Sequence, residues 1–122
     1  MQDDLPFNHT QEKYKGFLVN VYTDRSLERT LSFCIVTTEA AEGDENTRDR
    51  LANYMTTSTY PLRFHHLGFR PSVNLRNEPE KGVYTVGLNE FIIPNRQEEW
   101  LSEATRCIKE AIDKLQADSK QH

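Results

Sequence analysis

The feature that most restricts the fold is the run from Asn95 to Leu115, whose apolar residues recur at helical spacing. On a helical wheel these side chains occupy an arc of about 140°, and charged side chains fill the opposite arc. Asn95, followed three residues later by Glu98, forms a capping-box pattern that predicts where the helix begins. A helix with one apolar face must cover another apolar surface, so the rest of the chain has to supply one. The arc consists of Trp100, Leu101, Ala104, Cys107, Ile108, Ala111, Ile112 and Leu115.

Four segments rich in β-branched and aromatic residues predict that surface. Residues 15–23 and 27–37 are separated by a short turn and therefore predict an antiparallel hairpin. Residues 60–69 and 82–93 predict two further strands, and Gly87 in the last one predicts a bulge. Side chains alternate between the two faces of each strand. In the second strand one face therefore carries Leu27, Arg29, Leu31, Phe33 and Ile35, and the other face carries Glu28, Thr30, Ser32, Cys34 and Val36.

A second, shorter helix is expected from Glu45 to Met55, with Asp44 as its cap. The order ββαββα predicts a two-layer α+β fold, an antiparallel sheet of about four strands covered by two helices, the C-terminal one long and amphipathic. The 122 residues suit one domain, which we expect over residues 14–116. Residues 1–13 predict a flexible arm and residues 117–122 a frayed tail. The element order resembles that of secretion chaperones and toxin-immunity proteins, small acidic binding proteins.

Composition favours a cytoplasmic protein without membrane contact. The N-terminal residues lack the basic start and apolar stretch of a signal peptide, and no apolar run approaches the ~20 residues that span a bilayer. The two cysteines, Cys34 and Cys107, are far apart in sequence and outside any CxxC spacing. We therefore expect two buried, reduced thiols that pack as small apolar side chains.

Motifs for catalysis, metals or cofactors are missing from the sequence. No phosphate-binding glycine loop, nucleophile elbow or zinc-ligand spacing occurs, so we expect no cofactor, no metal and no catalytic residue. His65 and His66 are adjacent in a predicted strand and should point to opposite faces, which argues against a shared metal. Either could still serve as a general base. Glu90 is expected on the solvent face of the last strand.

The charge distribution is more informative than any motif. Between Arg50 and Asn77 there is no Asp, Glu or Lys, so the four arginines there give a formal charge of +4 in a chain whose net charge is −4. Arginine binds carboxylates and phosphates in bidentate fashion, and aromatic residues are interleaved with these arginines. The candidate binding residues are Arg63, His65, Phe69, Arg70 and Arg76, with Trp100 at the edge of the last helix.

These observations leave three hypotheses. The first is a small non-enzymatic protein-binding module, chaperone-, immunity- or regulator-like, whose partner is another protein or a second copy of the chain. The second is a nucleic-acid or nucleotide binder that uses the arginine and aromatic residues of segment 60–76. Overall acidity argues against the second, because phosphate backbones attract basic proteins. The third is a small enzyme that uses His65 or His66.

Overall fold

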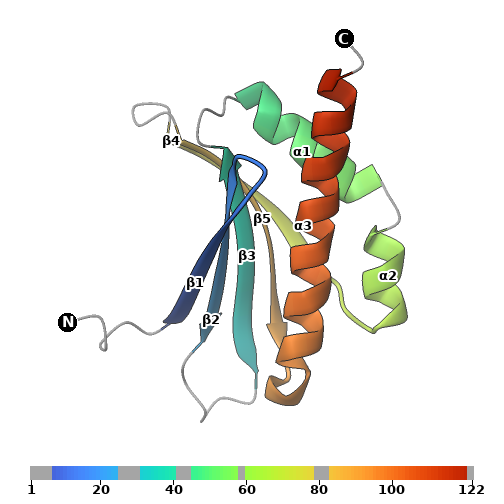
Figure 1. Ribbon diagram of the computed structural model, residues 1–122. Coiled ribbons are helices and arrows are strands. Elements are labelled where there is room, and N and C mark those ends of the chain that lie inside the picture. The colour runs from blue at the N-terminus through green and yellow to red at the C-terminus, as the bar shows by residue number, and fades with distance from the viewer. Residues whose placement is uncertain (1–6, 25–30, 41–44, 58–59, 79–82, 121–122) are drawn as a thin grey trace, which may run out of the picture.

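An antiparallel sheet with helices on one of its faces makes up the molecule, as the computed structural model shows (Figure 1). The structure describes residues 7–24, 31–40, 45–57, 60–78 and 83–120. Three expected features lie wholly or partly outside the described residues: Asp44 as the cap of the first helix, the turn at Asp24–Ser26 beyond Asp24, and residues 27–30 of the strand expected over 27–37.

The described strands and helices follow the order βββααββα. Five strands form one sheet in the spatial order β1-β2-β3-β5-β4, and every neighbouring pair is antiparallel. The α+β class and the long C-terminal helix are confirmed, whereas the expected order and the number of strands are corrected. The strands are β1 (Phe7–Tyr14), β2 (Phe17–Asp24), β3 (Ser32–Ala40), β4 (Ser72–Glu78) and β5 (Val83–Ile92); the helices are α1 (Glu45–Thr57), α2 (Tyr60–His66), a 3₁₀ turn (Pro94–Arg96) and α3 (Gln97–Lys120).

Strand β1 occupies most of the segment that was expected to be a flexible arm. It forms a hairpin with β2 through a two-residue turn at Lys15 and Gly16, both of which have positive φ angles, 51° and 88°. That backbone geometry is the one that tight hairpins require and that glycine adopts easily. Asp113 of α3 ties the hairpin down, because it accepts hydrogen bonds from Tyr14 Oη at 2.9 Å and Lys15 Nζ at 2.6 Å. The hydrogen bond from Lys15 lowers the pKa of Asp113.

Segment 60–66 is a helix, α2, where the sequence predicted a strand. A proline fits the first turn of a helix, where its missing N–H is not needed, and Pro61 takes that place. The helix ends in a Schellman motif: Phe69 N donates to Phe64 O at 2.7 Å, and Gly68 N to His65 O at 3.0 Å. Gly68 has a φ of 86°, which this motif requires of the residue after the helix. Pro61 and Gly68 therefore mark both ends of α2.

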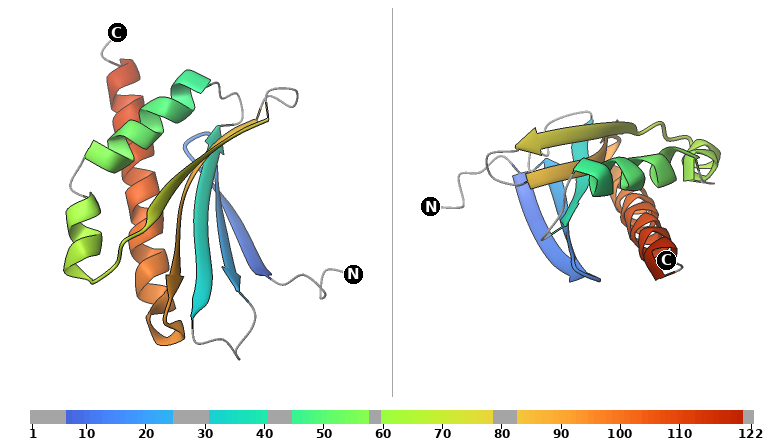
Figure 2. Two further views of the ribbon diagram at one scale, coloured as in Figure 1. Left: turned by 180° about the vertical axis from the view of Figure 1, so that it is seen from behind. Right: turned by 90° about the horizontal axis from the view of Figure 1, so that it is seen from above.

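All three helices lie on the same side of the sheet: α1 and α3 cover it, and α2 packs beside α1, as the views from behind and from above show (Figure 2). The core lies between this face and α3, with α1 packed across both. In β3 the buried set is Ser32, Cys34, Val36 and Thr38, so Phe33 and Ile35 face the other side. We call that other side the open face, because no helix among the described residues covers it.

The C-terminal helix confirms the predicted apolar arc but has different ends. It begins at Gln97, after a 3₁₀ turn that contains Asn95, so Asn95 is not its cap. It continues to Lys120, through most of the expected frayed tail. The buried members of the arc are Trp100, Ala104, Cys107, Ile108, Ala111, Ile112 and Leu115.

Gly87 forms no bulge, because the register between β3 and β5 runs unbroken through the pair Thr37 and Gly87. The reason for glycine is space: a Cβ there would lie 2.7 Å from Thr37 Cγ2 and 3.1 Å from the carbonyl oxygen of Val36. Gly87 therefore lets the central strands approach on the open face and leaves a depression there.

Candidate functional site

Arg63 lies in α2 and is engaged with two acidic side chains of α3. Its Nε donates to Glu103, and its Nη2 lies 3.2 Å from Glu110 Oε2. Partial burial alone lowers the pKa of Arg63, but the hydrogen bonds to both carboxylates outweigh this effect and raise it. Arg63 thus joins two helices and presents no uncompensated charge to a ligand.

Phe69 and Trp100 are buried, so neither presents a surface to a partner. The exposed fraction of Trp100 is 0%, which corrects the expectation of a contact at the edge of the last helix. Its ring lies 6.3 Å from that of Phe64, centroid to centroid, and the Arg96 guanidinium carbon lies 4.3 Å from the centre of the Phe69 ring. Both aromatic residues therefore belong to the packing between α2, α3 and the sheet.

Glu90 points toward the helices, although the sequence placed it on the solvent face. Its Oε1 accepts a hydrogen bond from Trp100 Nε1 at 3.0 Å, and both carboxylate oxygens lie 2.9 Å from Arg70 N. The carboxylate therefore links β5 to α3 and fixes the backbone of Arg70. The missed signal is its place in the strand, two residues after the buried Leu88 and hence on the same face.

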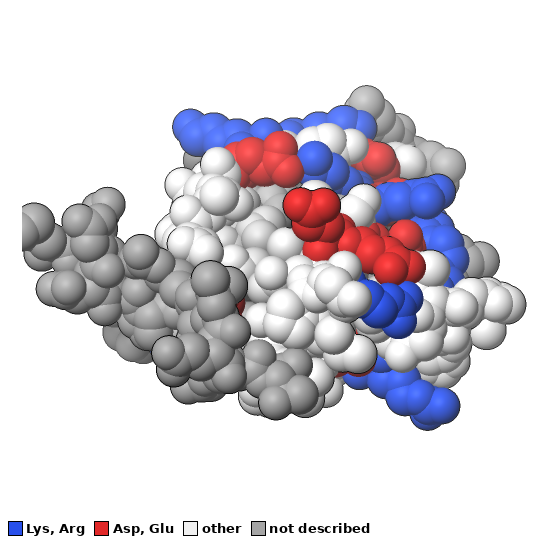
Figure 3. Space-filling model, turned by 90° about the horizontal axis from the view of Figure 1, so that it is seen from below, with Lys and Arg blue, Asp and Glu red and all other residues white. Residues whose placement is uncertain are grey.

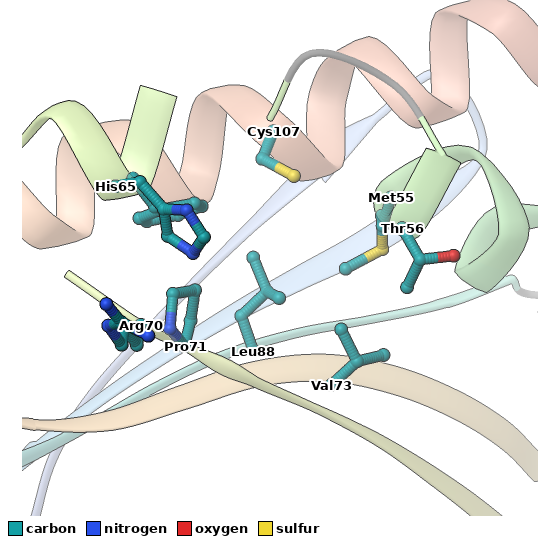
Figure 4. A pocket seen from close by; sticks show the side chains of 9 residues that line it. Met55, Thr56, His65, Arg70, Pro71, Val73, Leu88 and Cys107 are labelled. Carbon is teal, nitrogen blue, oxygen red and sulfur yellow. The ribbon is translucent and has the colours of Figure 1, made fainter. Parts of the chain in front are cut away.

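A cavity of about 330 Å³ lies between α1, α2, α3 and the strands β4 and β5. His65 and Arg70, two of the predicted binding residues, lie together at one end of it, and Met55 and Thr56 lie at the other (Figure 4). The exposed residues His65, Arg70 and Thr56 form its rim, while Cys107 lies buried in its lining.

Both histidines of the His65–His66 pair are exposed, whereas the sequence predicted one in the core. The difference follows from the helix: neighbouring residues in a helix are 100° apart, so both can lie on its outer side. Among the described residues there is no group of three or more side chains that could hold a metal ion.

Cys34 and Cys107 are free and buried, as expected. Burial raises the pKa of the Cys107 thiol to about 12 and also raises the pKa of Cys34. Because the thiolate is the nucleophilic form, neither side chain is activated for attack near neutral pH.

The open face carries a groove of about 640 Å³. At its centre Asn20 Oδ1 accepts a hydrogen bond from Gln11 Nε2 at 2.8 Å and lies 2.9 Å from His9 Nε2. The His9 ring stacks on Tyr22, with centroids 4.4 Å apart, and Gly87 lies in the groove lining. The groove is thus lined mainly by uncharged polar groups held by their own hydrogen bonds.

Charged side chains of both signs border this groove. Arg76, another predicted binding residue, lies here in β4, with its Nη2 2.9 Å from Glu78 Oε1. By strand alternation Lys13 and Asp24 share this face, and Glu39 lines the groove. Arg76 is therefore separated from Arg63 and Arg70, which belong to the helix side.

Four apolar side chains gather at one end of the open face, and we call them the apolar patch: Leu31, Phe33, Phe91 and Ile93. Phe91 is 57% exposed and Ile93 is 53% exposed. Phe33 and Phe91 face each other across the central strands, with ring centroids 4.7 Å apart. Leu31 directly precedes β3 and Ile93 directly follows β5, so the patch spans the ends of both central strands.

Comparison with family models, with curated proteins and with solved structures finds no match to this chain. Of the helices in the described ranges, none combines the length and apolar character needed to cross a membrane.

Proposed function

We propose that this chain is a small non-enzymatic protein-binding module, that it acts through the open face, and that the partner is a second copy of the chain. The observation that carries the proposal is the apolar patch. Large solvent-facing apolar clusters on monomeric proteins are uncommon and mark interaction sites. Two open faces packed against each other would form a β-sandwich, a standard way to bury such a surface.

Burial of the patch would contribute to the stability of such a dimer. Burying a phenylalanine or isoleucine side chain contributes about 1.5–3 kcal/mol. Phe91 and Ile93 are more than half exposed, and a symmetric interface would bury both residues of each copy. The groove beside the patch adds surface lined mainly by uncharged polar groups, whose desolvation costs less than that of charged groups.

The charges of the open face favour a second copy over a partner whose surface carries charge of mainly one sign. Lys13 and Arg76 accompany Asp24, Glu39 and Glu78 on this face. A surface with both signs can pair with itself in a twofold arrangement, whereas a surface of one sign would repel its copy. The same mixture disfavours a nucleic-acid backbone, which requires an excess of positive charge.

The candidate chemical groups support a binding role rather than catalysis. The thiol of Cys107 is neutral near pH 7 because its pKa is about 12. His65 and His66 have no carboxylate partner among the described residues that would orient an imidazole as a base. A cytoplasmic location, which the sequence predicts, fits two free and buried thiols.

The test is light scattering after size exclusion over a range of concentrations, with wild type, Phe91→Glu and Leu62→Glu. Leu62 is 61% exposed but lies in α2, away from the open face, and is the matched control. We expect the wild type and Leu62→Glu to rise from 14.2 kDa to twice that mass with concentration. Phe91→Glu should weaken the dimer at least about a hundredfold, since it buries a charge in place of an anchor.

Two outcomes would contradict the proposal. A wild type that stays monomeric at about 100 µM has no self-association of even micromolar strength. Equal weakening by Phe91→Glu and Leu62→Glu would place the interface elsewhere. Far-UV circular dichroism of each variant confirms that the fold is retained.

None of the observations above specifically favours the nucleic-acid alternative. Segment 60–76 contributes a helix and an edge strand rather than a stacking platform, and Arg63 and Arg76 both have acidic partners. Charges of opposite sign are intermixed on the side of the molecule seen in Figure 3, beside a largely uncharged area. Titration with single-stranded RNA and DNA at low salt is its direct test.

A further inference from the structure

We propose that the cavity beside Arg70 is a binding site for a small amphipathic carboxylate, an apolar chain of about ten non-hydrogen atoms with one anionic end. The site lies on the helix side of the sheet and is independent of the proposed dimer on the open face. Two separate observations carry the proposal: the apolar lining of the cavity and an arginine at its rim that has no salt-bridge partner within the part of the chain that the structure describes.

The cavity suits an apolar chain. Apart from its rim, the lining consists of apolar side chains and one neutral thiol: Met55, Phe64, Pro71, Val73, Leu88 and Cys107. Its volume of about 330 Å³ lies at the lower end of the ~300–1,000 Å³ typical of ligand sites. At ~30 Å³ for each water-sized group, about ten non-hydrogen atoms would fill it.

Arg70 differs from the other arginines that the structure describes. Each of the others lies within salt-bridge distance of at least one carboxylate; they are Arg48, Arg50, Arg63, Arg76, Arg96 and Arg106. Among the described residues no carboxylate lies within that distance of the Arg70 guanidinium. In an acidic chain, whose net charge is −4, an uncompensated arginine at the rim of an apolar cavity is a specific feature.

The backbone of Arg70 is fixed, while its guanidinium forms no hydrogen bond or ion pair with the residues that the structure describes. Glu90 holds the Arg70 amide with both oxygens at 2.9 Å and is itself bonded to Trp100. The arginine is therefore anchored at the cavity, beside Pro71 and on the same end as His65 (Figure 4). A guanidinium binds a carboxylate through two parallel N–H groups, which defines the anionic end of the ligand.

The test is calorimetric titration with octanoate, and with octan-1-ol and octylamine as neutral and cationic probes of equal chain length. We expect octanoate to bind saturably, octan-1-ol at least about tenfold more weakly, and octylamine not measurably. Amide chemical shifts of Val73 and Leu88 should move with octanoate, because both line the cavity. The Phe91→Glu variant should bind octanoate as the wild type does, so a failed dimer and a failed ligand site give different results.

Three variants locate the site. Arg70→Gln should weaken octanoate about tenfold and leave octan-1-ol unchanged, because only the charge-assisted contact is lost. Arg76→Gln, an exposed arginine on the open face, is the matched control and should leave both affinities unchanged. Thr56→Trp should abolish binding of both ligands, because Thr56 lies at the opposite end of the cavity and the larger side chain would fill that end.

Either of two results overturns the proposal. One is the absence of octanoate binding up to about 10 mM. Such an affinity would be weaker than a ligand of this size should reach in a fitting cavity. The other is an octanoate affinity that Arg70→Gln leaves unchanged, which would remove the anionic end from the ligand.

Discussion

Replacing Glu90 by leucine should be among the most damaging single changes at the junction between β5 and α3. The side chain accepts hydrogen bonds from Trp100 Nε1 at 3.0 Å and from Arg70 N at 2.9 Å. Leucine has a similar volume but accepts neither bond. The indole N–H belongs to a fully buried tryptophan and would lose its partner without gaining water.

The magnitude follows from the surroundings of each donor. Leaving a buried donor unsatisfied costs about 1–3 kcal/mol. The Arg70 amide is exposed and can bond to water instead, so its loss adds about 0.5–1 kcal/mol. We expect Glu90→Leu to lower the free energy of unfolding by about 1.5–4 kcal/mol. Glu90→Gln keeps one acceptor oxygen and should cost about 1 kcal/mol.

Urea unfolding measures these values, and the chain contains a single tryptophan, Trp100, as a fluorescent probe of the junction. Glu98→Leu, an exposed acid in the first turn of α3, is the control and should cost only a few tenths of a kcal/mol. A double-mutant cycle of Glu90→Leu and Trp100→Phe, followed by circular dichroism, should give a coupling of about 1 kcal/mol, because each change removes the hydrogen bond between the two side chains. A cost for Glu90→Leu below about 0.5 kcal/mol, with no coupling, would refute this reasoning.

Three further predictions concern the core and the surface pairs. Gly87→Ala should destabilise the fold by about 1–3 kcal/mol, because the new methyl group lies 2.7 Å from Thr37 Cγ2, and Thr37→Ser should recover part of this loss in urea unfolding. In the folded chain at pH 8, iodoacetamide should modify Cys107 far more slowly than in urea, since the pKa of the buried thiol is about 12; labelling as fast as in urea would contradict this. The pair of Lys15 and Asp113 stabilises the fold above the unfolded pKa of an aspartate, ~3.9, and loses this effect as pH falls through the lowered pKa of Asp113. The raised pKa of Lys15 extends this stabilisation upward until pH rises through that pKa. Thermal unfolding of Asp113→Asn should therefore differ from wild type at neutral pH and converge with it once pH falls below the lowered pKa of Asp113.

The sequence predicts best those elements whose side-chain pattern is set by one buried face. The apolar arc of α3 and the helix at Glu45–Thr57 are of this kind, since each buries a stripe at helical spacing. The same holds for the pairing of β2 with β3. These patterns arise from local geometry alone, and a single sequence contains them in full.

Strand β1 escaped prediction because it lies at the edge of the sheet. Its side chains are polar on both faces, so alternation carries no signal, and the strand is held by backbone pairing with β2. Contacts with α3 reinforce it, among them Lys109 Nζ at 2.9 Å from Glu12 Oε1. The turn at Lys15 and Gly16 also escaped prediction, because residues 15–23 were expected to form one strand.

The candidate site was predicted in part for a related reason. His65 and Arg70 lie together at one cavity, but Arg63 has its acidic partners 40 and 47 positions away in α3. Whether a charged residue is neutralised depends on such distant contacts, which spacing along the chain does not contain. The apolar patch was missed because the sequence of β3 does not determine which of its two faces is buried. That is decided by the packing of β5 and the helices against it.

The strand order also determines how long β3 waits for its second partner during synthesis. β3 pairs with β2 on one side at once, but its other partner, β5, lies about fifty residues further along the chain. At ~5–20 residues per second, the ribosome needs roughly 3–10 s to deliver that partner. For this interval the central strand of the future sheet, with Phe33, Ile35 and Val36, has an unpaired edge. Nascent chains stalled before Val83 should therefore be the form most prone to aggregate and most in need of a chaperone.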